Sequence, residues 1–322
     1  MKKINGTWLE LHHNGLPEGK YFNDAMHNFT DQQWKEKIKE IASLKMKYIV
    51  IMSTAYSDSK NVEPITFYDS KHYKKSTLLK AKDPLEAILQ EADKQDMKVF
   101  MSTGFYAPWD LPGDNMSKED TYQKAFVGME ELFELYGHHK SFYGWYLPDE
   151  SEIHKYFDED CITYVNRFAS FANKLKKEHK ILIAPYGTCK LVADDYFVSQ
   201  LKRMDADFIA YQDEVGVKKT DENHTATFYK NLCEAHKKAN KSKLWADLEV
   251  FTFEGEVYKS ALLPANINRL KKQIEAISPY VEEILIFEYQ GMFNMPNSKA
   301  FCGHEDSVKY YNDYAELLKT ID

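Results

Sequence analysis

Short runs of β-branched and aromatic residues alternate with longer amphipathic segments along the whole chain. The short runs are typical of buried strands, and the apolar spacing of three and four in the longer segments is typical of helices. Eight runs predict strands, at residues 6–11, 48–54, 98–105, 142–148, 181–186, 208–212, 244–250 and 283–289. A predicted helix follows each of them, so the pattern is a repeated strand–helix unit.

Two of the helices have clear start signals. Thr30 and Gln33 have the spacing of a capping box, in which a hydroxyl and an amide satisfy free backbone groups at a helix N-terminus. Asp83 followed by Pro84 combines a capping carboxylate with a proline in the first turn. Further helices are predicted at residues 117–136, 158–177, 192–204, 221–240, 265–277 and 305–321.

Eight strand–helix units are the number at which a parallel sheet closes into a (β/α)8 barrel, the TIM barrel. We therefore predict an α/β fold with one barrel domain over residues 1–322. A doubly wound open sheet is the competing architecture, but the nucleotide-binding sequence G-x-G-x-x-G is absent, as is a Walker A sequence. No low-complexity run or charge block marks an internal boundary.

Composition narrows the range of partners. The chain of 322 residues has a formal net charge of −8, which argues against binding to nucleic acid phosphates. Its 4 cysteines contain no Cys-x-x-Cys pair, so a zinc knuckle or disulfide scaffold is not indicated. The N-terminus lacks the apolar stretch of a secretory signal and no apolar run is long enough to span a membrane, so we expect a cytoplasmic protein without membrane association.

The reactive groups of such a barrel lie where the strands end, because those ends and the following loops form its open mouth. Carboxylates gather at the later strand ends, and two of them can cleave a glycosidic bond if they face each other across a sugar. Glu150 follows the fourth predicted strand and Glu249 ends the seventh. Our mechanistic hypothesis is that Glu150 is a protonated general acid and Glu249 an ionised nucleophile, with retention of the anomeric configuration. Retention requires a carboxyl separation of about 5–5.5 Å, whereas a gap of about 6.5–9.5 Å would indicate inversion through a positioned water.

Other acids nearby are predicted to have lesser roles. Trp245, Asp247 and Glu249 share one face of the seventh strand, and Asp247 lies a layer deeper, as a structural residue would. Asp149 and Glu214 are each next to a residue that is a better candidate for the site. Neighbouring side chains point to opposite faces, so we expect these two acids to cap a helix or to face solvent. Any single acid at the rim could also cap a helix or pair with a lysine.

Aromatic residues make up 14% of the chain, more than a core alone requires. Flat rings cover the apolar face of a pyranose, and carboxylate or amide groups hold its hydroxyls. The predicted substrate-binding residues, all near strand ends, are Glu10, His12, Tyr56, Trp109, Tyr186, Gln212, Asp213, Glu288 and Tyr289.

Two phrases resemble a known family. The sequence GWYLP at 144–148 followed by two acids, and YQD at 211–213 with VGV at 215–217, is similar to a bacterial TIM-barrel family of unknown function grouped with the large retaining clan of glycoside hydrolases. The resemblance implies that Glu150 is the acid/base and Glu249 the nucleophile. The clan typically has Asn before the fourth-strand Glu, whereas Asp149 stands here, and the arginine often found after the second strand is missing.

Two alternatives use the same barrel differently. A metal-dependent isomerase or aldolase would join acids and histidines around a cation, but of 11 histidines only His12 and His13 fall at a predicted strand end. We therefore predict neither a metal nor another cofactor. A non-catalytic carbohydrate-binding barrel would keep the rings without needing two opposed acids. The sequence leaves the sugar, the linkage and the oligomeric state open.

Overall fold

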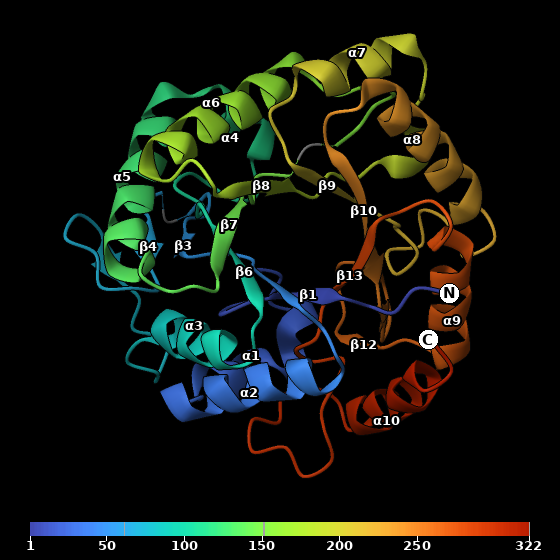
Figure 1. Ribbon diagram of the computed structural model, residues 1–322. Coiled ribbons are helices and arrows are strands. Elements are labelled where there is room, and N and C mark those ends of the chain that lie inside the picture. The colour runs from blue at the N-terminus through green and yellow to red at the C-terminus, as the bar shows by residue number, and fades with distance from the viewer. Residues whose placement is uncertain (61, 151, 322) are drawn as a thin grey trace.

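The computed structural model describes residues 1–60, 62–150 and 152–321, and its centre is a closed barrel of eight parallel strands (Figure 1). Hydrogen bonds join β13 to β1 and so close the sheet. The predicted (β/α)8 barrel is confirmed, and most strands end two or three residues before their predicted limits. The barrel strands are β1 (Gly6–Leu9), β2 (Tyr48–Ile51), β6 (Lys98–Ser102), β7 (Phe142–Tyr146), β8 (Lys180–Ile183), β9 (Phe208–Gln212), β10 (Lys243–Glu249) and β13 (Glu283–Phe287).

Helices form a ring around the barrel (Figure 1). The capping box is present, because Thr30 Oγ1 accepts a hydrogen bond from the Gln33 amide and Gln33 Oε1 accepts one from the Thr30 amide. No helix of the described chain is long and apolar enough to cross a membrane. The ring helices are α2 (Asp31–Ser43), α3 (Pro84–Lys94), α5 (Glu119–Tyr136), α6 (Glu159–Leu175), α7 (Asp195–Arg203), α8 (Thr225–Ala239), α9 (Ile267–Ile277) and α10 (Asp306–Leu318).

Several short elements in the connecting segments were not predicted. They are too short to show a hydrophobic period, so pattern alone does not detect them. Most of them lie in segments that follow the C-terminal ends of barrel strands, and they help to wall the mouth. They are η1 (Glu18–Tyr21), α1 (Asn23–His27), β3 (Ala55–Tyr56), β4 (Ile65–Thr66), β5 (Lys74–Lys75), α4 (Pro112–Ser117), η2 (Thr188–Lys190), β11 (Phe251–Phe253) and β12 (Leu262–Pro264).

Large aromatic side chains fill the inside of the barrel. Trp8, Phe100, Tyr146 and Trp245 belong to one buried cluster, separate from the larger layer between sheet and helices. The rings of Trp245 and Phe208 are stacked with their centres 4.2 Å apart. This packing fills the barrel below the mouth.

The close approach of β7 to β8 explains one glycine of the GWYLP phrase. A Cβ atom at Gly144 would lie 2.2 Å from the carbonyl oxygen of Lys180. We expect Gly144→Ala to lower the free energy of unfolding by about 1–3 kcal/mol, as overpacking does elsewhere. Urea unfolding measures the change. Gly113→Ala is the matched control, since nothing lies within 4 Å of its added Cβ, and an equal loss in both variants would contradict this explanation.

Candidate active site

The mouth of the barrel is a cavity of about 720 Å³ at the C-terminal ends of the strands. Carboxylates and aromatic rings dominate its lining. The residues that line it are Glu10, His13, Asn14, Gly15, Glu18, Met52, Phe105, Trp109, Asp110, Pro112, Pro148, Glu150, Glu152, Tyr186, Gln212, Glu214, Val217, Lys219, Asp247, Glu249, Phe251, Tyr258 and Phe287. Both predicted catalytic acids are therefore in one cavity.

Glu150 follows β7 after three intervening residues and is only partly exposed. Its Oε1 accepts a hydrogen bond from the hydroxyl of Tyr146 over 3.3 Å. Burial raises the pKa of Glu150 to about 7, and the nearby Glu10 adds to the rise, while hydrogen bonds from Gln212 and Tyr146 oppose it. A carboxyl group with such a pKa keeps a proton close to neutral pH, as a general acid must.

Asp149, at the position where the retaining clan has Asn, does not line the mouth. Its side chain is buried behind the cavity, where Oδ1 accepts from the Asn115 amide over 2.9 Å and Oδ2 from the Tyr164 hydroxyl over 3.1 Å. Burial raises the pKa of Asp149 to about 6. This acid joins β7 to the helices outside it through side-chain hydrogen bonds, which is neither the capping nor the solvated position expected from sequence.

Glu249 is the last residue of β10 and is buried at the rim of the cavity. Its Oε2 accepts a hydrogen bond from the backbone amide of Val217 over 2.8 Å. Burial raises the pKa of Glu249, and the carboxylate of Asp213 raises it further. The free barrel therefore favours a proton on this acid too, which differs from the ionised state expected at rest.

The YQD and VGV phrases surround Glu249. Asp213 Oδ1 accepts from the Glu249 backbone amide over 3.0 Å, and Asp213 Oδ2 accepts from the Gln273 amide over 2.6 Å. A Cβ atom at Gly216 would lie 2.9 Å from Glu249 Oε2, so the turn passes directly against the carboxylate. Nη2 of Arg269 donates to the backbone carbonyls of both Glu249 and Phe251. These contacts fix the backbone and the carboxylate at the end of β10.

Asp247 lies one layer below Glu249 on the same strand and also lines the cavity. Its side chain is buried, and Oδ1 has no hydrogen-bond partner within the described structure. Burial raises the pKa of Asp247 well above its usual range, and the charges of Glu150 and Glu249 raise it further. Asp247 is therefore a third acid of the site rather than part of a filled core.

A second buried group of charges lies where β1 and β13 end. His13 Nδ1 is 2.5 Å from Glu10 Oε2, and His13 Nε2 is 3.8 Å from Glu18 Oε2. Burial alone would lower the pKa of His13, but the two carboxylates raise it to about 10. Potential metal-ligand atoms of Glu10, His13 and Glu288 all lie within 4.8 Å of one another. This cluster is the part of the mouth that could hold a cation.

The structure brings only some of the predicted substrate-binding residues into the cavity. Glu10, Trp109, Tyr186 and Gln212 line it. The others, which the described cavity lining does not include, are His12, Tyr56, Asp213, Glu288 and Tyr289. Asp213 and Glu288 instead contact residues that do line it, since Asp213 accepts from the Glu249 amide and Glu288 has ligand atoms within 4.8 Å of those of Glu10 and His13.

Three of the five make specific contacts behind the mouth. The Tyr56 hydroxyl donates to Asp58 over 2.5 Å, and the Tyr56 side chain also hydrogen-bonds Trp109, so it supports a ring of the cavity. His12 Nδ1 lies 3.0 Å from His27 Nε2. Tyr289 is fully buried in the layer between sheet and helices. None of these contacts faces the cavity.

Sequence reasoning missed several residues of the mouth. Phe287 pairs with Glu249 in the β10–β13 register and faces inward like Leu285, so the alternation along β13 could have identified it. Lys219 and Tyr258 lie in irregular loops, where no periodic signal exists. Glu18 belongs to a short 3-10 helix that the sequence pattern did not indicate.

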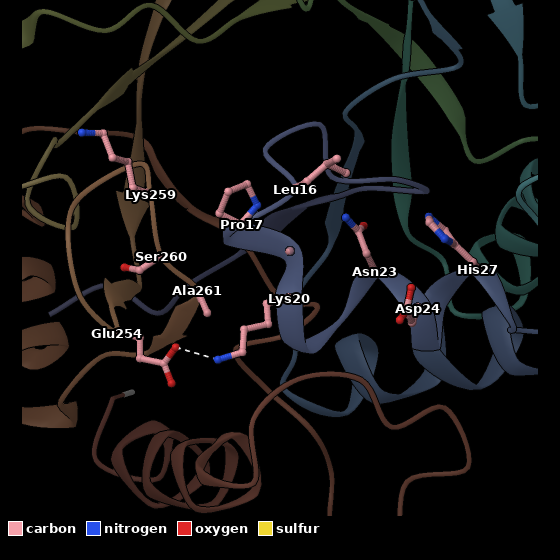
Figure 2. A pocket seen from close by; sticks show the side chains of 11 residues that line it. Leu16, Pro17, Lys20, Asn23, Asp24, His27, Glu254, Lys259, Ser260 and Ala261 are labelled. Carbon is pink, nitrogen blue, oxygen red and sulfur yellow. Dashed lines mark hydrogen bonds and ion pairs between the residues drawn. The ribbon is translucent and has the colours of Figure 1, made fainter.

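A second hollow of about 500 Å³ adjoins the mouth (Figure 2). One wall is the segment of residues 16–20, and the other runs through Glu254 and residues 259–261. Glu18 within the first segment, Gly15 directly before it, and Tyr258 directly before residues 259–261 line the mouth itself. Neighbouring residues of the same two chain segments therefore line the two hollows.

The sequence comparison identifies the family. A family model described as a Domain of unknown function (DUF4434) matches residues 4–300. The chain belongs to this family. The DUF4434 assignment confirms the resemblance drawn from the GWYLP and YQD phrases. No curated protein matches the chain.

Among the solved structures similar to this DUF4434 chain are several described as glycoside hydrolases or as provisional members of that class. A Bacteroides thetaiotaomicron protein assigned provisionally as an α-L-fucosidase matches with a TM-score of 0.75 and 17% identity, over 98% of this chain and 93% of that one. An endo-1,4-β-D-mannanase from Thermotoga petrophila has a TM-score of 0.62 and 9% identity, over 99% and 100%. A GH2 β-galacturonidase from Eisenbergiella tayi has a TM-score of 0.58 and 13% identity, over 99% and 51%. At these identities the likeness shows a shared fold.

The raised pKa of Asp247 has a consequence for stability. The folded chain binds the Asp247 proton more tightly than the unfolded chain does. The stability that this proton contributes is therefore present below about pH 4 and is lost as the pH rises towards the folded pKa. We expect Asp247→Asn to raise the free energy of unfolding by about 1–3 kcal/mol at pH 8 and by less at pH 5. Urea unfolding at both pH values measures this. Asp195→Asn, at an exposed acid, is the control, and an equal gain at both pH values would contradict the reasoning.

Proposed function

We propose that this DUF4434 chain is a glycoside hydrolase with Glu150 and Glu249 as its two catalytic carboxyl groups. One observation supports the proposal above the others: Glu150, shortly after β7, and Glu249, at the end of β10, line a single cavity that aromatic rings also line. The pair provides the two functional groups that glycosidic cleavage requires. The glycosidase fold of the structural neighbours is consistent with it.

In the proposed first step, the proton of Glu150 passes to the glycosidic oxygen while a Glu249 oxygen attacks the anomeric carbon. The bond to the leaving group breaks, and a covalent glycosyl ester forms on Glu249. The Val217 amide holds Oε2, which leaves Oε1 to attack. The reaction needs one proton on the pair, carried by Glu150, whose pKa of about 7 suits a general acid near neutral pH. Because the free barrel also favours a proton on Glu249, that acid must lose its proton before it attacks.

In the second step, Glu150 accepts a proton from water as that water attacks the anomeric carbon. The ester bond to Glu249 breaks, and the sugar leaves with its original configuration. Rings from different parts of the chain surround the space above the acids, among them Trp109, Tyr186 and Phe287. They would cover the apolar face of the bound sugar.

The two roles predict different responses to the leaving group. Glu150→Gln should lower kcat/KM by about 10²–10⁴-fold for a 4-methoxyphenyl glycoside and far less for a 2,4-dinitrophenyl glycoside, whose departure needs no proton. Glu249→Gln should abolish turnover of both substrates while the substrates still bind. Steady-state kinetics and thermal-shift binding measure these effects.

Glu256→Gln, at an exposed acid outside the cavity lining, serves as the control and should retain wild-type rates. Unchanged turnover of both substrates by a folded Glu249→Gln variant would rule out the nucleophile assignment.

The Glu10, His13 and Glu288 cluster favours a second candidate, a metal-dependent sugar isomerase or aldolase. The strong pairing of His13 with Glu10 and Glu18 opposes metal binding, because a ligand histidine must give up that proton.

We expect dialysis against EDTA to change glycoside turnover by less than about twofold, because the proposed mechanism uses only carboxyl groups. Assays before and after dialysis measure this. Loss of activity that Mn²⁺, Zn²⁺ or Ca²⁺ restores would instead favour the metal-dependent candidate.

A further inference from the structure

Acidic side chains greatly outnumber basic ones in the mouth. Eight carboxyl-bearing side chains line it: Glu10, Glu18, Asp110, Glu150, Glu152, Glu214, Asp247 and Glu249. Against them, the described lining contains two basic side chains, His13 and Lys219, and no arginine. Even with protons on the acids whose pKa is raised, the cavity presents acceptors and neutral carboxyl groups rather than cations.

Both basic side chains already have carboxylate partners. His13 lies between Glu10 and Glu18, at 2.5 Å and 3.8 Å. Lys219 Nζ is 3.5 Å from Glu214 Oε1 and stands over the ring of Tyr186, 4.8 Å from its centre. A negatively charged ligand would have to break one of these pairs to obtain a counter-ion, and it would leave a buried carboxylate unpaired.

The adjoining hollow offers no replacement. Lys20 points across it to Glu254 with an N–O distance of 2.9 Å, which Figure 2 shows as a dashed line. Lys259 is paired with Glu256 at 2.6 Å. The charged side chains of Glu152 and Lys190, at the edge of the mouth, are likewise in contact with each other.

We infer that the site accepts neutral sugars or sugars with a protonated amine, and rejects uronates and sulfated sugars. The inference rests on the proposed glycosidase function and adds a substrate class to it. A sugar carboxylate or sulfate is normally held by Arg or Lys, and both cations of the mouth are engaged. Neutral hydroxyl groups, by contrast, can donate to the many carboxylate oxygens of the wall. An ammonium group would gain charge-assisted hydrogen bonds there.

The experiment has a turnover arm and a binding arm. Wild-type protein is assayed with a panel of α- and β-linked 4-nitrophenyl glycosides that contains the hexosides, the fucosides, the N-acetylhexosaminides and the glucuronide and galacturonide. The Glu249→Gln variant is applied to an array of neutral, amino-sugar, uronate-containing and sulfated glycans. We expect turnover and binding of uncharged or amine-bearing members only, with at least about a hundredfold preference over any uronide, because unpaired like charges in a buried site are strongly unfavourable.

The outcomes test the glycosidase function and the substrate class separately. Turnover of a uronide, or binding of a uronate or sulfated glycan, at levels equal to the best neutral member overturns the substrate class and leaves the glycosidase function intact. Binding of neutral glycans without turnover of any substrate overturns the hydrolase proposal and upholds the ligand class. Absence of both turnover and binding overturns both.

A charge reversal at the rim tests the cause of the selectivity. Asp110 lines the mouth and is exposed, so Asp110→Arg adds a free cation with little risk to folding. We expect it to reduce the preference for neutral over uronate glycans by about fivefold, and by less in 1 M salt. Asp195→Arg changes net charge equally at an exposed site on α7 and should leave the preference unchanged. Equal effects of both variants would show that the charged mouth does not set the selectivity.

Discussion

Closure of the eight-stranded sheet is the constraint on which the other features depend. Once β13 pairs with β1, every second side chain of each strand must point at the barrel axis. The lower positions are filled by rings such as Trp245 and Phe100, and the upper positions are left for polar groups. The strand ends thereby bring Glu150 and Glu249 into one cavity, although about a hundred positions separate them in sequence.

The acids of the mouth are costly to bury, and the surrounding structure offsets that cost only in part. Val217, Arg269 and Gln273 give the end of β10 backbone and side-chain hydrogen bonds. Asp247 has an oxygen without a partner, and its pKa is raised well above the usual range by burial and by its acidic neighbours. A concentration of protonated carboxyl groups in an open cavity is more typical of a site for chemistry than of a structural network.

The sequence predicts the fold well because the strand–helix period is repeated eight times and the errors at single boundaries do not accumulate. It also predicts both catalytic candidates, since each lies at the end of a strongly patterned strand. Alternation separates the predicted residues that line the mouth from some of those that do not: Glu10 and Gln212 share a face with the buried Trp8 and Ala210, as residues that line the mouth must.

The same rule would have replaced Glu288 with Phe287, which shares a face with Leu285. It does not exclude Tyr289, which has the same parity as Phe287 but lies beyond the end of β13. Pattern could not reveal Lys219 or Tyr258, because loops have no period and their positions depend on contacts formed only in the folded chain. Asp213 was predicted to touch substrate, but its carboxylate instead accepts the amide of Glu249. Roles of this kind depend on side-chain direction, which residue type alone does not specify.

The Arg269 guanidinium touches the end of β10 and the start of the β11–β12 hairpin with the same nitrogen. The hairpin contributes to the walls of both hollows, so its position is mechanically coupled to the backbone of Glu249. We therefore expect substitutions within the family to be tolerated at the tip of this hairpin. At its base, the backbone must keep the positions that the Arg269 contacts require. If the hairpin were exchanged between relatives, it would keep its position relative to Glu249 only where this arginine is exchanged with it.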